Sequence, residues 1–174
     1  MPADAAKAAG LLFVAVVVQL SIVANIEIFR GHPNLLLVTV VCVALLRGAI
    51  FGAVAGFSAG LLADTGVFGT LGFTSLLLTL AGYWVGRYGE TTGRDRAHAP
   101  LLSVAVITVL YQFGALILHF VLGEPAPARE VLLISLVPTM IVNVALTVPV
   151  YALARRLFRP VQSARSVQEA RLVG

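Results

Sequence analysis

The sequence RGAIFGAVAGFSAGLLADTG, residues 47–66, repeats Gly48, Gly52, Gly56, Gly60 and then Asp64 at every fourth position. Residues four apart lie one above the other on an α-helix, so these positions form one stripe along it. An interior glycine costs a helix about 1 kcal/mol relative to alanine in water, and a close helix–helix contact in a bilayer offsets that cost. The pattern predicts a helix-packing stripe of glycines on a central helix. The alternative is an Ala- and Gly-rich membrane helix without a dedicated partner.

The composition around this stretch is that of a membrane protein. Of the 174 residues, 59% are hydrophobic and 11% are charged, against about 45 to 50% and 25% in soluble domains. We therefore expect an all-α integral membrane protein, a bundle of six transmembrane segments of which the second and third are short. The apolar runs are residues 8–26, 35–46, 49–63, a segment within 65–85, 101–122 and 131–154.

These runs also define the expected domain organisation. We expect a polytopic membrane domain at residues 1–160 and a flexible cytoplasmic tail at residues 161–174. The first run is long enough to span the membrane, so we interpret it as a retained helix and not as a cleaved signal. The second and third runs are either two tilted spans or a re-entrant hairpin. The main loop is expected from Arg87 to Pro100, and Pro138 and Pro149 are expected to kink the last helix.

The basic residues indicate how the bundle is oriented. With the N-terminus in the cytoplasm, six spans leave only Arg30 and Arg129 outside. The residues placed inside are Lys7, Arg47, Arg87, Arg94, Arg96, Arg155, Arg156, Arg159, Arg165 and Arg171. This asymmetry follows the positive-inside rule and predicts that both termini are cytoplasmic. The net charge of +4 thus reports membrane orientation, and we expect no nucleic-acid partner.

The residues that could carry catalysis or bind a metal do not form a convincing site. Ser58 lies in a G-x-S-x-G pattern, but a nucleophile elbow needs a strand, a turn and a helix, whereas this pattern lies within a helix. His119 has no second His, Cys or carboxylate at ligand spacing, and Cys42 is the single cysteine. We therefore predict that the protein is not an enzyme and has no catalytic residues, metal site or cofactor.

Polar residues inside the apolar runs are functional candidates because they are expensive to place in lipid. They are Gln19, Ser58, Gln112, His119 and Asn143. None is a carboxylate or an arginine, so interhelical hydrogen bonding is favoured over ion transport for Gln19, Gln112, His119 and Asn143. A pocket for a small neutral ligand is the alternative.

Asp64 is expected at the outer end of the third segment, where the helix macrodipole disfavours a carboxylate. The favoured interpretation is a local cap of the next segment, with hydrogen bonds from the amides of Gly66 or Val67. The alternatives are an ion pair with Arg30 or Arg129, and an exposed charge without a partner.

An ordered set of motifs resembles the MreD family of rod shape-determining proteins. The set is Pro33-Asn34-Leu35-Leu36-Leu37, Arg47-Gly48, Gly52, Gly56-Phe57, Gly60-Leu61-Leu62 with Asp64, Gly69, Leu71-Gly72, Gly82-Tyr83 and Gly86-Arg87. It covers residues 33–87, and the second half of the chain matches in hydropathy and length. The family typically has Asp where this sequence has Asn34.

The resemblance implies a non-enzymatic inner-membrane scaffold of the cell-elongation machinery that binds the bitopic protein MreC. Through MreC, such a scaffold would link MreB filaments to the peptidoglycan polymerase and transpeptidase of the lateral wall. The family is also similar in fold to the six-helix substrate-binding subunits of vitamin ECF transporters. A transporter subunit that binds a vitamin is therefore the alternative function.

Overall fold

The computed structural model describes residues 2–21, 32–67, 71–92, 98–123 and 134–158. Six helices separated by short non-helical stretches make up these ranges, and the expected all-α bundle of six segments is confirmed. The helices are α1 (Pro2–Ser21), α2 (Leu35–Arg47), α3 (Ala49–Val67), α4 (Phe73–Thr92), α5 (Ala99–Leu122) and α7 (Leu136–Leu157). The tail expected at residues 161–174 lies outside the described residues.

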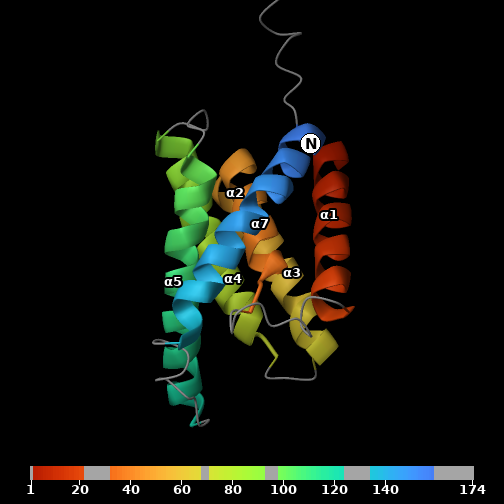
Figure 1. Cartoon of the computed structure of the whole chain (residues 1–174). Helices are drawn as coiled ribbons and strands as arrows, with labels where there is room; N and C mark the ends of the chain where they lie inside the picture. The colour runs from red at the N-terminus through yellow and green to blue at the C-terminus, as the bar shows by residue number, and fades with distance from the viewer. Residues whose placement is uncertain (1, 22–31, 68–70, 93–97, 124–133, 159–174) are drawn as a thin grey trace, which may run out of the picture.

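The central helix of the bundle is α2 and not α3, which corrects the expectation from the glycine stripe. Every residue of α2 from Leu36 to Leu45 is at most 2% exposed, and α2 packs against α1, α3, α4, α5 and α7. Figure 1 shows α2 behind α7, between α1 and α5. Because it is apolar all round, α2 can be covered by other helices on every side. Glycines permit close contact on one face only, and the other face of α3 exposes Ile50 and Val54.

Three helix boundaries differ from those expected. The α3 helix continues to Val67 and is 19 residues long, so the third segment is not short. The α4 helix runs on to Thr92, and the loop expected from Arg87 therefore begins after that residue. Pro138 lies in the first turn of α7, where a proline removes no intrahelical hydrogen bond, so it does not act as an interior kink.

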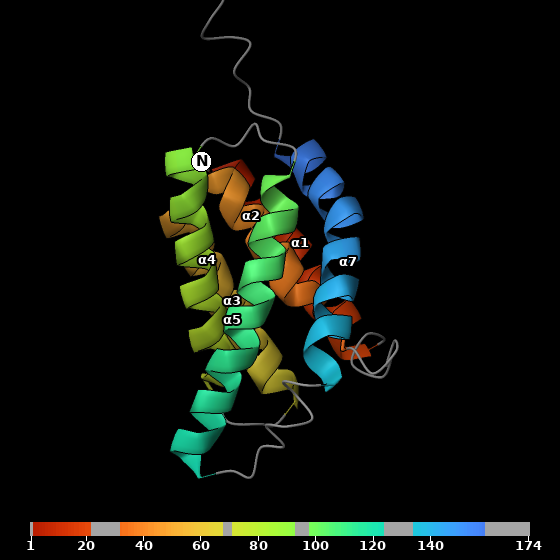
Figure 2. The ribbon, with the colours of Figure 1, turned by 60° about the vertical axis from the view of Figure 1, so that its left-hand side comes forward.

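The helices of the bundle differ widely in length, unlike those of a bundle in which every helix spans the same thickness. Three are long and apolar enough to cross a membrane among the described residues: α3 over Ala49–Gly66, α5 and α7. The α2 helix has 13 residues, or about 20 Å, and α5 has 24 residues, or about 36 Å. In Figures 1 and 2 one end of α5 reaches beyond its neighbours.

The two ends of the bundle differ in charge. The described basic residues on the helices are at one end, which we call the basic end: Lys7, Arg47, Arg87, Arg155 and Arg156. Lys7 Nζ donates to the Leu157 carbonyl at 3.4 Å, and the Arg47 guanidinium lies 4.9 Å from the centre of the Phe158 ring. The opposite end, where α1 and α3 finish and α2, α4 and α7 begin, is called the far end.

Candidate functional site

Buried polar side chains gather at the far end, around the start of α2. Asn34 is the N-cap of this helix, and its Oδ1 accepts the backbone N–H of Leu37 at 2.9 Å. Gln19 of α1 accepts the Leu35 N–H at 2.8 Å and donates to the Pro33 carbonyl at 3.3 Å. Side chains therefore satisfy amides at the first turn of α2, as a buried helix terminus requires.

Asn143 connects this cap to the opposite side of the bundle. It lies on α7, is fully buried, and accepts the Asn34 N–H through Oδ1 at 2.8 Å. Its Nδ2 donates to Thr108 Oγ1 of α5 at 3.1 Å. A backbone N–H can only donate, so the amide orientation of Asn143 is fixed by this network. Asn143 thus holds α5, α7 and the start of α2 together.

A partly open polar cavity of about 330 Å³ lies next to this network. On the wall of this cavity, the backbone N–H of His32 donates to Thr139 Oγ1 at 3.1 Å. The Tyr111 side chain lies beside those of Thr74 and Asn34. The cavity is lined by Gln19, His32, Pro33, Asn34, Leu37, Thr108, Tyr111, Gln112, Ser135, Thr139 and Asn143. These groups are suited to hydrogen bonding with a bound molecule, and none of them is a carboxylate, a lysine or an arginine.

Asp64 forms a second polar cluster at the far end, between α3 and α4. The side chain is buried and accepts the backbone N–H groups of Gly72 at 2.9 Å, Thr74 at 3.2 Å and Ser75 at 3.3 Å. Asp64 therefore caps the next helix, which is the type of interaction that the sequence predicted. The expected donors were wrong, because α3 continues through residues 66 and 67 and their amides belong to that helix. Arg30 and Arg129, the alternative partners, lie outside the described residues.

The glycine stripe of α3 lies directly against the backbone of α4. A Cβ atom on Gly56 would collide with the Leu78 carbonyl, and one on Gly60 would lie 2.6 Å from the Ser75 nitrogen. A Cβ on Gly52 would lie 2.5 Å from the Ala44 Cβ of α2 and would also collide with the Gly82 carbonyl. Such close backbone contact is typical of helices that pack through small residues in a membrane.

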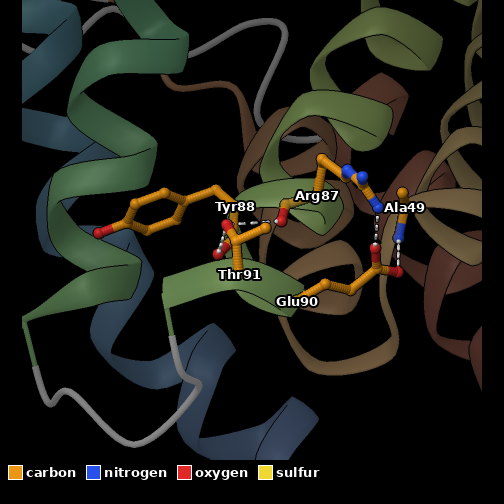
Figure 3. Close-up of polar contacts among 5 residues, drawn as sticks. All are labelled: Ala49, Arg87, Tyr88, Glu90 and Thr91. Carbon is orange, nitrogen blue, oxygen red and sulfur yellow. Dashed lines mark hydrogen bonds and ion pairs between the residues drawn. The ribbon is translucent and has the colours of Figure 1, made fainter.

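Gly48 does not lie on the α3 helix with the other glycines of the stripe. It lies in the turn between α2 and α3. Its φ of +99° is a conformation that residues with side chains rarely adopt. Glu90 of α4 accepts the Ala49 N–H at 2.8 Å and lies 3.5 Å from Arg87 Nη1 (Figure 3). A Cβ atom on Gly48 would collide with the Glu90 carboxylate. Glu90 thus accepts an N–H at the start of α3 at the basic end, as Asp64 accepts N–H groups at the start of α4 at the far end.

The remaining predicted residues have separate surroundings. His119 of α5 packs against Phe73 of α4, with ring centres 4.9 Å apart. Gln112 lines the far-end cavity. Ser58 is exposed on α3 and donates to the Val54 carbonyl of its own helix at 2.8 Å. The structure therefore brings Gln19, Gln112 and Asn143 together around one cavity and leaves His119 and Ser58 apart from it.

Several residues of these clusters were not predicted from the sequence to be site residues. Asn34 followed by an apolar run is a recognisable N-cap signal. The buried threonines Thr108 and Thr139 carry no such signal, because threonine is common in apolar helices. Glu90 contacts a residue 41 positions earlier, and no local pattern indicates a contact of that kind.

Comparison with known proteins identifies the family of this chain. A family model described as rod shape-determining protein MreD matches residues 8–161, and neither the curated proteins nor the solved structures give a match. The matched range contains the Asn34 cap, the glycine stripe, the Asp64 cluster and most of the helical bundle. The chain therefore belongs to the MreD family of rod shape-determining proteins, and it is a multi-pass membrane protein.

Proposed function

We propose that this protein is a non-enzymatic scaffold of the bacterial inner membrane in the machinery that elongates rod-shaped cells. It binds the transmembrane helix of an MreC-like bitopic protein. Through that partner it links cytoplasmic MreB filaments to the polymerase and transpeptidase of the lateral wall. The observation that carries this proposal is the family match over residues 8–161.

The proposed orientation follows from the charges of the helix ends. Lys7, Arg47, Arg87, Arg155 and Arg156 all lie at the basic end, and short cytoplasmic loops carry an excess of such residues. In the proposed orientation the basic end faces the cytoplasm, both termini are cytoplasmic and the far end faces the periplasm. This places the basic end on the side where filaments assemble.

We further propose that the partner's helix docks in an apolar groove between α4 and α5. The groove has a volume of about 290 Å³ and is lined by Trp84, Val85, Tyr88, Leu102, Ser103, Val106, Ile107 and Leu110. Figure 2 shows α4 and α5 side by side at the surface of the bundle. Trp84 is 64% exposed, and tryptophan is a frequent anchor in protein interfaces. The small Ser103 is compatible with close approach of another helix.

Co-purification of the partner with matched variants tests this proposal. Val106→Trp fills the groove, whereas Val54→Trp adds the same bulk to the exposed face of α3, away from the groove. Both valines are exposed, so neither change should unfold the bundle. We expect an MreC-like protein from the same organism to co-purify with wild type and with Val54→Trp, and to be lost with Val106→Trp. Equal capture by all three proteins would place the docking surface elsewhere.

The co-purification experiment also distinguishes the scaffold function from the alternative function as a transporter subunit. A scaffold captures the MreC-like protein whether or not a small molecule is bound. If the protein captures a vitamin-sized ligand and no MreC-like protein in any preparation, the transporter interpretation replaces the scaffold.

A further inference from the structure

The far-end cavity lies at a depth where the rest of the bundle is inside the membrane. The α2 helix covers about 20 Å from the basic end, whereas a bilayer has a hydrocarbon thickness of about 30 Å. On one side the cavity is lined by Thr108, Tyr111 and Gln112 from the middle of α5. The non-helical residues His32 to Asn34 line the cavity. Non-helical backbone at membrane depth is stable where it is buried in protein or borders a polar cavity.

The lining is polar without carrying a fixed charge. Four amide side chains and four hydroxyl groups face the cavity together with the imidazole of His32, and no Lys, Arg, Asp or Glu is among the described lining residues. A charged ligand would lose its hydration here without gaining an opposite charge. The lining therefore favours an uncharged molecule.

Three N–H groups at the start of α2 are already used within the protein. The N–H groups of Asn34, Leu35 and Leu37 are accepted by Asn143, Gln19 and Asn34. An anion at a helix N-terminus needs such N–H groups to be available. The lining groups that can serve a ligand therefore include mainly side-chain amides and hydroxyls.

Gln112 is the lining residue best placed to serve a ligand. Its side chain is half-buried and makes no hydrogen bond to the described part of the chain, whereas the amides of Gln19 and Asn143 are engaged in the network. An amide offers two donors and an acceptor. Ser135, the N-cap residue of α7, is a second lining residue outside the network.

We propose that this cavity binds one small, uncharged molecule that carries several hydroxyl or amide groups, with Gln112 as a direct hydrogen-bonding residue. A volume of about 330 Å³ is at the lower end of ligand sites and equals roughly ten water-sized groups. That size corresponds to a monosaccharide or a nucleoside. The inference goes beyond the scaffold function, because it concerns a small-molecule site at the far end and not the proposed docking groove between α4 and α5.

Ligand binding is tested on the full chain reconstituted in lipid nanodiscs. The probes are glucose, N-acetylglucosamine and uridine, and the control for each is its phosphate monoester. We expect at least one uncharged probe to raise the melting temperature and to bind in equilibrium dialysis, while its phosphate ester does neither. Binding of the phosphate ester equal to or tighter than that of the parent probe would overturn the proposed neutral site.

Variants then locate the binding. Gln112→Leu keeps the size of the side chain and should weaken binding of the same probe roughly tenfold, whereas Ser58→Ala on the outer face of α3 should not change it. If Gln112→Leu lowers the melting temperature of the free protein, Ser135→Ala serves as the second variant. Unchanged binding in both cavity variants overturns the assignment of the site.

Absence of any ligand would also overturn the proposal. Native mass spectrometry of the protein released from its own membrane should detect a small neutral adduct that Gln112→Leu lacks. If none of the probes binds and no adduct is found, the cavity holds water alone and the inference is wrong.

Discussion

Asp64 is stabilised by the helix that follows it and not by the helix that carries it. Near the end of α3 the macrodipole disfavours a carboxylate, but the start of α4 presents the opposite end of a dipole. The Asp64 oxygens accept three backbone N–H groups there, those of Gly72, Thr74 and Ser75. The favourable contact with the start of α4 thus offsets the unfavourable position of Asp64 near the end of α3.

Substitution of Asp64 should therefore be harmful in a graded manner. Asp64→Leu leaves these buried N–H groups without acceptors and should cost about 2 to 4 kcal/mol of unfolding free energy. Asp64→Asn retains one acceptor oxygen and turns an NH₂ group toward one of the backbone donors. It should cost about 1 to 2 kcal/mol. Reversible unfolding in mixed micelles measures both values, and a neutral Asp64→Leu would show that the cap contributes nothing.

Asn143 allows a test of the polar network at the start of α2. Asn143→Leu should cost about 2 to 3 kcal/mol because it leaves the part-buried Asn34 N–H and the buried Thr108 hydroxyl without this partner. Thr108→Val removes the other partner of the same amide. A double-mutant cycle of the two changes should give a coupling energy of about 1 kcal/mol. Thr79→Val, whose hydroxyl bonds only within α4 to Ser75, is the control and should show no coupling to Asn143→Leu.

At the residue scale, the sequence predicted the kind of interaction better than its partners. Asp64 was expected to cap the next segment, and it does so through amides eight to eleven positions away. The contact between Asn34 and Asn143 joins residues 109 positions apart. Local spacing carries no information about which helix will lie opposite such a side chain, so these partners required the folded structure.

The pair α3 and α4 is the tightest packing arrangement in the bundle, because glycine lets the two backbones meet. Gly52→Leu, Gly56→Leu and Gly60→Leu would each place a side chain inside the α4 backbone. Overpacking of this kind costs about 1 to 3 kcal/mol or more. Each variant should melt several degrees below wild type in detergent.

Gly10 provides a matched control for these substitutions. It lies on α1, where an added Cβ meets no atom within 4 Å. Gly10→Leu should leave the melting temperature unchanged or raise it slightly, since leucine has the higher helix propensity. Equal stability of all four variants would mean that the stripe faces lipid and has no packing role.

At the element scale, apolar runs located the helices but not their arrangement. The α2 helix was found within one residue of its limits, since its run is bounded by Asn34 and Gly48. The extension of α4 to Thr92 was missed because Arg87 and Glu90 interrupt the hydropathy. These residues lie at the basic end, where Glu90 bonds to the start of α3. The central place of α2 was not predicted, because the glycines of α3 indicate where two helices come closest. They do not indicate which helix is surrounded by the others.

The whole molecule is polarised along its axis. The described helix cations lie at one end, and the neutral polar cavity with the Asp64 cluster lies at the other. Five further basic residues expected inside, Arg94, Arg96, Arg159, Arg165 and Arg171, lie outside the described ranges, as do Arg30 and Arg129 expected outside. The orientation therefore stays a prediction that rests on the helix ends.

Cysteine accessibility tests this orientation directly, because the protein supplies almost no background. Its single cysteine, Cys42, is fully buried on α2 and should not react with a membrane-impermeant maleimide until the protein is denatured. Leu71, in the turn before α4 at the far end, and Arg156 at the basic end are both exposed, so Leu71→Cys and Arg156→Cys each add one accessible thiol. In intact spheroplasts we expect labelling of Leu71→Cys alone, with Arg156→Cys reacting only after the membrane is opened. The positive-inside asymmetry gives this direction. The reverse pattern would place the basic end in the periplasm. It would contradict the proposal that this end faces the cytoskeletal filaments.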